Sequence, residues 1–201
     1  MTGQSSFPGF EEAKPTDRLF LALFPPPETA LEIAGLAARL RSDHALRGRP
    51  LEAARFHITL NHLGDYAGLP PDVVRRAGVA AAKAAAATQP FTVTFDRAES
   101  FASMPRNRPL VLRGGEGLSA LMAFHQTLGM ALRKNNLGQW AKPGYTPHVT
   151  LLYDDKLLGS TPVAPVAWTA GEVVLVHSLL GETRHVHLAR WPLSGLPEAG
   201  P

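Results

Sequence analysis

Short apolar runs alternate along the chain with longer stretches of helical spacing. A short apolar run, or a strict alternation of apolar and polar positions, is typical of a β-strand. On this basis we predict strands at residues 18–24, 55–63, 91–95, 110–112, 147–153, 173–179 and 185–191. We predict helices at 27–41, 71–87 and 115–136. Proline stands at the start of the first two, and Gly138 follows the third.

The order of these elements divides the chain into two similar halves, with a boundary near residues 102–108. Each half has too few strands to bury both faces of its own sheet, so we expect one α/β or α+β domain over residues 17–193. Residues 1–16 hold several glycines, serines and prolines without periodicity and are expected to form a disordered tail. Residues 194–201 are expected to be a flexible C-terminus for the same reason.

Composition narrows the class of protein. The 201 residues are 45% hydrophobic and 18% charged, which allows a sizeable core and argues against disorder. The net charge of +3 is compatible with an anionic ligand. The absence of cysteine excludes disulfides, thiolate zinc sites and a cysteine nucleophile, and it fits the cytoplasm. No apolar run reaches the roughly 18 residues of a membrane span, and none suits a signal peptide, so we expect no membrane association.

Two similar tetrapeptides, one in each half, are the candidates for chemistry. They are His57-Ile58-Thr59-Leu60 and His148-Val149-Thr150-Leu151. Residues two apart in a strand share a face, so each segment presents a histidine beside a threonine while the intervening residues enter the core. One such segment alone would be an ordinary amphipathic strand, but two copies in corresponding halves favour a functional site.

Two histidines and two hydroxyls that face one another suit the hydrolysis of a phosphodiester. Histidine acts as acid or base near neutral pH, so one imidazole could take a proton from water while the other protonates a leaving alkoxide. Two threonine hydroxyls could donate hydrogen bonds to the non-bridging oxygens of the phosphate. No metal, cofactor or nucleophilic side chain is required, and a strained cyclic phosphate is a fitting substrate.

These motifs resemble those of the 2H phosphoesterases, and within them the bacterial RNA 2′,3′-cyclic phosphodiesterases, also called 2′-5′ RNA ligases. The resemblance extends over most of residues 17–193. Besides the two motifs it includes Arg18-Leu19-Phe20-Leu21-Ala22-Leu23, Arg106-Asn107-Arg108-Pro109-Leu110-Val111-Leu112, Ser178-x-x-Gly181 and Arg190-Trp191-Pro192-Leu193. The paired histidine motifs are specific, and the rest is supporting pattern.

The resemblance implies an α+β fold of two similar lobes, whose antiparallel-rich sheets face each other across a pseudo-twofold cleft with the helices outside. It implies an enzyme that hydrolyses a terminal 2′,3′-cyclic phosphate to a 2′-phosphate. By the same resemblance His57 would be the proton donor to the leaving 3′-oxygen and His148 the proton acceptor that activates water. Thr59 and Thr150 would hold the phosphate.

Three further residues are candidates for substrate binding. Several relatives have an arginine five residues after the second motif histidine, where this chain has Tyr153. Strict alternation would turn Tyr153 away from His148, so a role in the site requires a strand end or a bulge. Arg55 shares the face of His57 by the same alternation and could supply the missing charge, although a solvated strand end is an equal alternative. Phe24 ends the first strand and is either a core residue or a platform for a base.

The last expectations concern metals, cofactors and partners. His185 and His187 stand two apart and could chelate a metal, but no acidic residue lies nearby in the sequence, so we expect neither a metal nor a cofactor. RNA ends or 2′,3′-cyclic nucleotides are the expected substrates. We expect a monomer with no obligate protein partner.

Two alternatives remain open. One is a non-catalytic module that binds a nucleotide or RNA in the same cleft, which the intact motifs disfavour. The other is ligation, the reverse reaction, in which a ribose hydroxyl replaces water and joins a 2′,3′-cyclic end to a 5′-hydroxyl.

Overall fold

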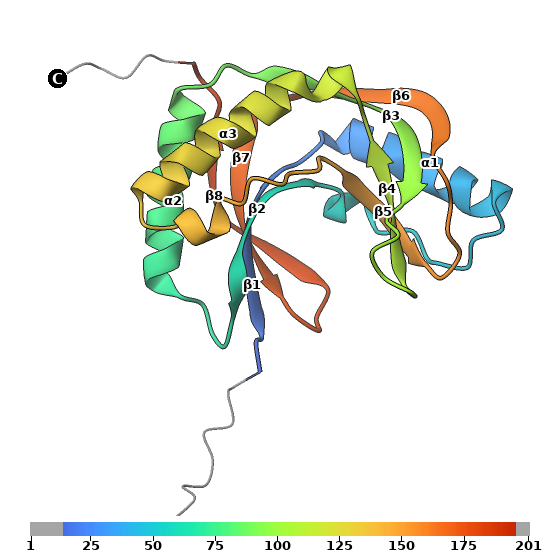
Figure 1. The fold of residues 1–201 in the computed structure, drawn as a ribbon, viewed down its shortest axis with the longest axis horizontal. Coiled ribbons are helices and arrows are strands. Elements are labelled where there is room, and N and C mark those ends of the chain that lie inside the picture. Colours follow the sequence, from blue (N-terminus) through green and yellow to red (C-terminus); the bar gives the residue numbers. More distant parts are fainter. Residues whose placement is uncertain (1–13, 196–201) are drawn as a thin grey trace, which may run out of the picture.

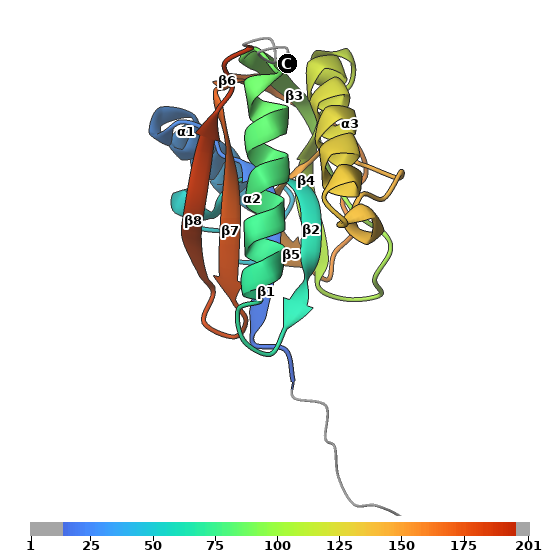
Figure 2. The same cartoon turned by 90° about the vertical axis from the view of Figure 1, so that its left-hand side faces the viewer.

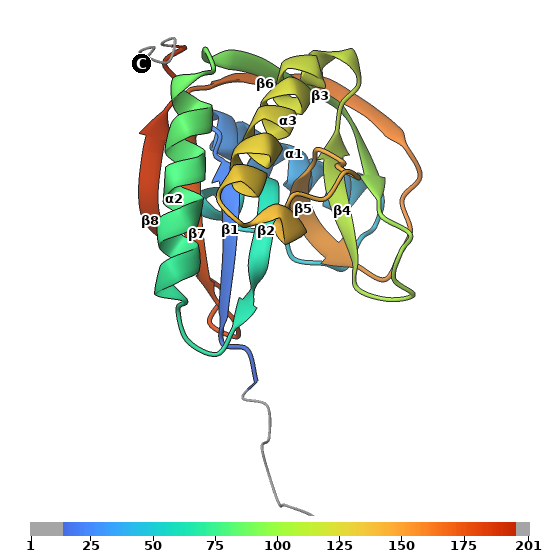
Figure 3. The same ribbon diagram turned by 60° about the vertical axis from the view of Figure 1, so that its left-hand side comes forward.

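Residues 14–195 are described by a computed structural model, so the expectations for residues 1–13 and 196–201 lie outside the described part of the chain. Within that part, eight strands form one antiparallel sheet in the order β6-β3-β4-β5-β2-β1-β7-β8. Figure 3 shows the run from β8 to β4 from left to right. The strands are β1 (Asp17–Leu23), β2 (Ile58–Tyr66), β3 (Phe91–Ser100), β4 (Arg108–Arg113), β5 (Val149–Asp154), β6 (Thr161–Ala170), β7 (Glu172–Leu179) and β8 (Arg184–Pro192).

Three α-helices accompany the sheet in the described residues: α1 (Pro27–Asp43), α2 (Pro71–Ala86) and α3 (Ser119–Lys134). Prolines begin α1 and α2, because the first turn of a helix needs no N–H partner there. Figure 1 shows α2 and α3 side by side at one end of the molecule and α1 at the other. Short 3₁₀ turns are η1 (Ala53–Arg55), η2 (Glu116–Leu118) and η3 (Gly138–Trp140).

The sheet consists of two four-stranded halves that meet at a single residue pair. The half β2-β1-β7-β8 and the half β6-β3-β4-β5 are joined where Ile58 of β2 pairs with Val149 of β5. The predicted division of the chain near residues 102–108 is therefore wrong, because β3 lies with the later strands β4 to β6 while β7 and β8 return to the half that contains β1 and β2. The expected antiparallel α+β fold is therefore present, as one sheet that is continuous at its centre. The two residues that join the halves are the central residues of the two histidine motifs.

The two faces of the half β2-β1-β7-β8 have different roles. Leu19, Leu21 and Leu23 of β1 are fully buried and belong to the main core, to which α2 contributes its alanines. In Figure 2, α2 lies in front of β7, β1 and β2. The alternate residues Phe20 and Ala22 form a small separate cluster on the other face of the strand. This second face is the one that carries the histidines.

One strand was absent from the sequence-based prediction. β6 contains Pro162 and Pro165, which interrupt the pattern of a strand, and it occupies an edge of the sheet. Proline is tolerated at an edge because its missing N–H has no ladder partner to lose.

At the C-terminal end of the described residues, the backbone N–H groups of Ser194 and Gly195 donate hydrogen bonds to the carbonyl oxygens of Ala85 and Thr88. No helix within residues 14–195 is long and apolar enough to cross a membrane.

Candidate active site

A pocket of about 460 Å³ lies where the two halves of the sheet meet, and both histidine motifs line it. Of the seven candidate catalytic and substrate-binding residues, six line this pocket: Arg55, His57, Thr59, His148, Thr150 and Tyr153. We call it the histidine pocket. Phe24 lines a neighbouring pocket instead, but its ring contacts that of His57 at a centroid distance of 5.5 Å.

The pairing of Ile58 with Val149 explains why the motifs lie together. In an antiparallel pair, the residues that flank a matched position lie opposite each other, so this register puts His57 opposite Thr150 and Thr59 opposite His148. Ile58 and Val149 are themselves fully buried on the core side. Each histidine is thereby placed beside the threonine of the other motif.

Both histidines are held by the backbone in the same way. The Nδ1 of His57 lies 2.7 Å from the carbonyl oxygen of Arg55, and the Nδ1 of His148 lies 2.7 Å from that of Thr146. A carbonyl oxygen only accepts, so Nδ1 carries the proton in each ring. In the neutral state Nε2 is then the free acceptor of both imidazoles, and it becomes a donor when the ring is protonated. The two rings are equipped for proton transfer through the same atom.

The surroundings of His57 are largely aromatic. Its ring stacks on Phe20 at 5.0 Å between centroids and meets the edge of His185 at 5.4 Å. The pKa of His57 is lowered from 6.5 to about 4, chiefly by burial and to a smaller extent by the nearby imidazoles and the Arg55 guanidinium. The hydrogen bond to the Arg55 carbonyl opposes this shift. His57 is therefore neutral in the free protein at pH 7.

Among the described residues, His148 has one aromatic ring contact, with Phe101, whose ring meets it edge-on at 4.9 Å between centroids. The guanidinium of Arg113 lies over the Phe101 ring, 5.8 Å from its centroid. The pKa of His148 is also lowered, first by burial and then by the charge of Arg113, while the hydrogen bond to Thr146 raises it. His148 thus also rests in the neutral form.

Matching β-bulges shape both motif strands. On β2, Thr59 pairs with Ala22 and Asn61 with Leu21, so Leu60 is the extra residue. On β5, Thr150 pairs with Val111 and Leu152 with Leu110, so Leu151 is the extra residue. Each bulge reverses the alternation beyond it.

The bulge on β5 brings Tyr153 to the site. Tyr153 pairs with Pro109 and Thr150 with Val111, two partners that share a face of β4, so Tyr153 and Thr150 share a face of β5. The same relation on β2 brings His62 to the histidine pocket. Tyr153 is 44% exposed at the rim.

The charges around the histidine pocket are positive. Arg18 lines it but is held by Asp65 through two hydrogen bonds of 2.7 Å. Arg55 lines it without a carboxylate partner among the described residues, and its Nε is buried with no hydrogen bond. No aspartate or glutamate is among the described residues that line this pocket. Such an environment favours an anion.

Sequence reasoning did not assign Phe20, Ser178 or His185 to the site, although all three line the histidine pocket. The rings of Phe20 and His185 also contact that of His57. The alternation of β1 contained the signal for Phe20, because Phe24 was assigned to the site and Phe20 lies on the same face. His185 had been considered only as a metal ligand. It lines the histidine pocket whereas His187 lines the neighbouring one, and residues 14–195 contain no cluster of three or more metal-ligating side chains.

Paired His-x-Thr segments at the centre of an antiparallel sheet are the arrangement that a resemblance to the two-histidine phosphoesterases implies. The model of the 2′-5′ RNA ligase superfamily matches residues 25–182, and the chain belongs to this family. A search of curated protein sequences gave no match.

Solved structures agree with this assignment. The Escherichia coli LigT complex with 3′-AMP is 26% identical with a TM-score of 0.70, and the comparison covers 90% of this chain and 99% of LigT. The LigT complex with ATP is 26% identical with a TM-score of 0.67 over the same shares. A structure described only as a phosphoesterase is 25% identical with a TM-score of 0.69, again over 90% of this chain and 99% of the other.

Proposed function

We propose that this protein hydrolyses the 2′,3′-cyclic phosphate of an RNA end or of a nucleotide to a 2′-phosphomonoester. The observation that carries this proposal is the Ile58–Val149 pair, which places two histidines with the same protonation pattern beside two threonines. Family membership and the nucleotides in the LigT complexes support a nucleotide substrate.

The cyclic phosphate binds between the two imidazoles. The hydroxyls of Thr59 and Thr150 donate hydrogen bonds to its non-bridging oxygens and stabilise the charge that develops at phosphorus. The guanidinium of Arg55 supplies the positive charge that relatives draw from an arginine after the second motif. The phosphate occupies the histidine pocket, whose described lining residues include no carboxylate.

His148 acts as the proton acceptor. Its Nε2 is free in the neutral ring, and it takes a proton from the attacking water as the new P–O bond forms. His57 acts as the proton donor, and its Nε2–H protonates the 3′-oxygen as the P–O3′ bond breaks. His57 is neutral in the free protein, so it acquires its proton when the anionic phosphate binds and raises its pKa.

The two halves of the sheet are related in this proposal by a pseudo-twofold axis through the Ile58–Val149 pair. The equal spacing of the bulges at Leu60 and Leu151 supports it, as does the equal anchoring of both Nδ1 atoms. The fold would then be two similar lobes whose site lies on the axis, so that each lobe contributes one half of the acid–base pair.

The test is incubation with adenosine 2′,3′-cyclic phosphate and with an RNA that ends in a 2′,3′-cyclic phosphate. We expect 2′-phosphate products from both, and none with His57→Ala or His148→Ala. Binding without turnover would instead identify a non-catalytic nucleotide-binding module. A 3′-phosphate product would contradict the roles assigned to the histidines.

Ligation is a second candidate, which the name of the matched family favours. In ligation a 5′-hydroxyl attacks the cyclic phosphate in place of water, so His148 takes the proton of this hydroxyl as the new P–O bond forms and His57 protonates the 3′-oxygen as the P–O3′ bond breaks. Adding a 5′-hydroxyl RNA to the same assay tests it, since a 2′-5′ linked product reports ligation directly.

A further inference from the structure

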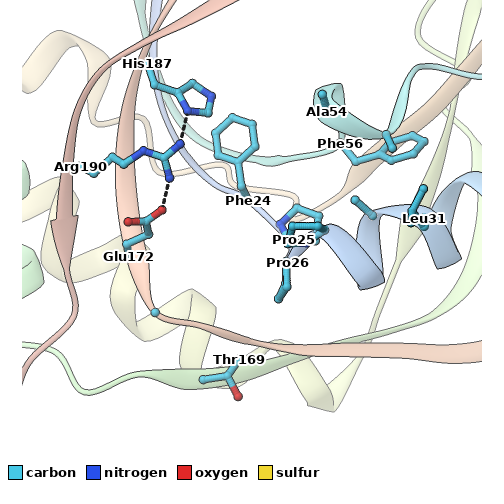
Figure 4. Close-up of a pocket in the computed structure, with 14 residues that line it drawn as sticks. Phe24, Pro25, Pro26, Leu31, Ala54, Phe56, Thr169, Glu172, His187 and Arg190 are labelled. Carbon is cyan, nitrogen blue, oxygen red and sulfur yellow. Dashed lines mark hydrogen bonds and ion pairs between the residues drawn. The ribbon is translucent and has the colours of Figure 1, made fainter.

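A second pocket adjoins the histidine pocket on the same face of the sheet. It has a volume of about 640 Å³, and its walls come from the loop after β1, from η1 and α1, and from the ends of β6, β7 and β8. We call it the proline pocket, after Pro25, Pro26 and Pro27 in its wall. Figure 4 shows Pro25 and Pro26 on one side and Glu172, His187 and Arg190 on the other.

The two pockets are separated by one aromatic ring. The ring of Phe24 lies 5.5 Å from that of His57 and 4.5 Å from that of His187, centroid to centroid. His57 lines the first pocket and His187 the second. The proline pocket therefore begins on the His57 side of the phosphate position, directly beyond Phe24.

Strand register confirms that one surface carries both pockets. On β7, Ser178, Val176, Val174 and Glu172 share a face, and their partners on β8 are His185, His187, Arg190 and Pro192. Ser178 and His185 line the histidine pocket, while Glu172 and Arg190 line the proline pocket. A substrate can extend along these strands from one pocket into the other.

The larger part of the proline pocket wall is apolar and partly flat. Phe24, Phe56 and the prolines form it, and Leu31 stands at its edge with 67% of its surface exposed. Aromatic and proline rings present the kind of surface on which a planar heterocycle stacks. The volume lies within the range of about 300–1,000 Å³ that small-molecule sites occupy.

The opposite wall is polar but electrically balanced. Arg190 donates hydrogen bonds to Glu172 and to the Nδ1 of His187. Because Nδ1 of His187 accepts a hydrogen bond, His187 is neutral and carries its proton on Nε2. The charge of Arg190 is matched by that of Glu172. This wall therefore offers donors and acceptors without net charge, which suits an uncharged base, whereas the unmatched Arg55 suits the phosphate.

We propose that the proline pocket binds the base of the substrate nucleoside whose phosphate lies in the histidine pocket. This inference rests on the proposed function, in which His57 protonates the leaving 3′-oxygen. The ribose that carries this oxygen then lies on the His57 side, and Phe24 is the ring between it and the proline pocket. The base stacks on the aromatic and proline wall and faces the Glu172, His187 and Arg190 groups with its polar edge.

The experiment compares adenosine 2′,3′-cyclic phosphate with methyl ribofuranoside 2′,3′-cyclic phosphate, which lacks a base. In the wild type we expect the nucleotide to have a KM about tenfold lower, the contribution of one stacked base. Thr169→Trp fills the pocket from the exposed edge strand β6 and should make the two KM values equal. Ala167→Trp is the matched control, exposed on the same face of β6 but outside the pocket, and should keep the tenfold ratio.

Leu31→Ser is a second variant at an exposed helix position, so it keeps the fold. It should lower the ratio of the two KM values about threefold. If Thr169→Trp and Leu31→Ser both keep the wild-type ratio while hydrolysis proceeds, the base does not bind in the proline pocket, and the proposed function stands without it.

If the wild type hydrolyses neither compound, the proposed function fails. Calorimetric titration with 3′-AMP then decides whether the proline pocket binds a base. Weaker binding to Thr169→Trp than to Ala167→Trp would retain a base site in the proline pocket. Equal binding to the two variants, or no binding to the wild type, would overturn it.

Discussion

The two histidine motifs are alike in their backbone and different in their surroundings. In each motif the histidine Nδ1–H donates a hydrogen bond to the carbonyl oxygen two residues earlier, and a β-bulge lies one residue after the threonine. His57, however, lies among Phe20, Phe24 and His185, while His148 has Phe101 as its ring neighbour. Similar strands place the reactive atoms, and side chains from other strands distinguish the two rings.

This difference is consistent with the roles proposed for the two rings. Burial among aromatic rings lowers the pKa of His57 to about 4 in the free protein, so the ring stays neutral until the bound anion raises this pKa and the ring takes up a proton. The leaving alkoxide requires a proton donor, and the protonated ring supplies it. His148 requires only that its neutral form be present, which its lowered pKa ensures.

The largest effect is expected when the histidine of either motif is replaced. His57→Ala and His148→Ala should each lower kcat on adenosine 2′,3′-cyclic phosphate by roughly 10²- to 10⁴-fold, because each removes one proton-transfer partner. The double variant should be far less than multiplicatively worse, since both residues act on one transition state. His44→Ala, at the end of α1 and outside the pocket, is the control. Near-full activity in either histidine variant would end the acid–base interpretation.

A smaller effect is expected at the threonines. Thr59→Val and Thr150→Val keep the shape of the strand and remove one phosphate donor each, which should cost roughly 10- to 10³-fold in kcat. Because the register places the two threonines symmetrically, the two losses should agree within about tenfold. A loss confined to one of them would show that the phosphate lies off the centre of the pair.

The residues that follow the two bulges also differ between the motifs. Tyr153 on β5 and His62 on β2 occupy matching positions, but His62 is held by Asp65 at 2.9 Å. Tyr153→Ala should raise the KM of an RNA with a cyclic end about tenfold by loss of a stacking ring, whereas Tyr153→Phe should be near wild type. A tenfold effect of Tyr153→Phe would instead assign the role to its hydroxyl.

Much of this arrangement follows from the sequence, and the exceptions have physical causes. The alternation in His57-x-Thr59 and His148-x-Thr150 correctly placed each pair on one face. The same rule turned Tyr153 away, because a one-residue bulge at Leu151 leaves no local mark in the sequence.

Long-range neighbours were harder to predict. His185 reaches His57 only because β8 follows β7 and β1 across the sheet, a neighbourhood set by strand order. β6 was missed because edge strands tolerate the prolines that argue against a strand elsewhere.

The pH dependence tests whether both imidazoles rest neutral. The donor must be protonated, so the rate falls as pH rises above its pKa; the acceptor must be neutral, so the rate falls as pH drops below its pKa. Both pKa values are lowered from 6.5 in the free protein, so both limbs of kcat/KM should lie below pH 6.5. The two apparent values belong to the coupled pair. A plateau of kcat/KM that extends through neutral pH would contradict the lowered pKa values.

The smallest expected effect is that of a chelator, and it separates two interpretations that the histidine variants do not. If His57 and His148 were metal ligands, alanine at either position would also abolish activity. A metal hydrolase needs three or four protein ligands, often with a carboxylate. The described lining residues include no carboxylate, and residues 14–195 contain no cluster that could hold an ion. EDTA should therefore leave the hydrolysis of adenosine 2′,3′-cyclic phosphate unchanged. Loss of activity in EDTA that a divalent ion restores would instead make the paired histidines ligands, and the difference in their surroundings would lose its catalytic meaning.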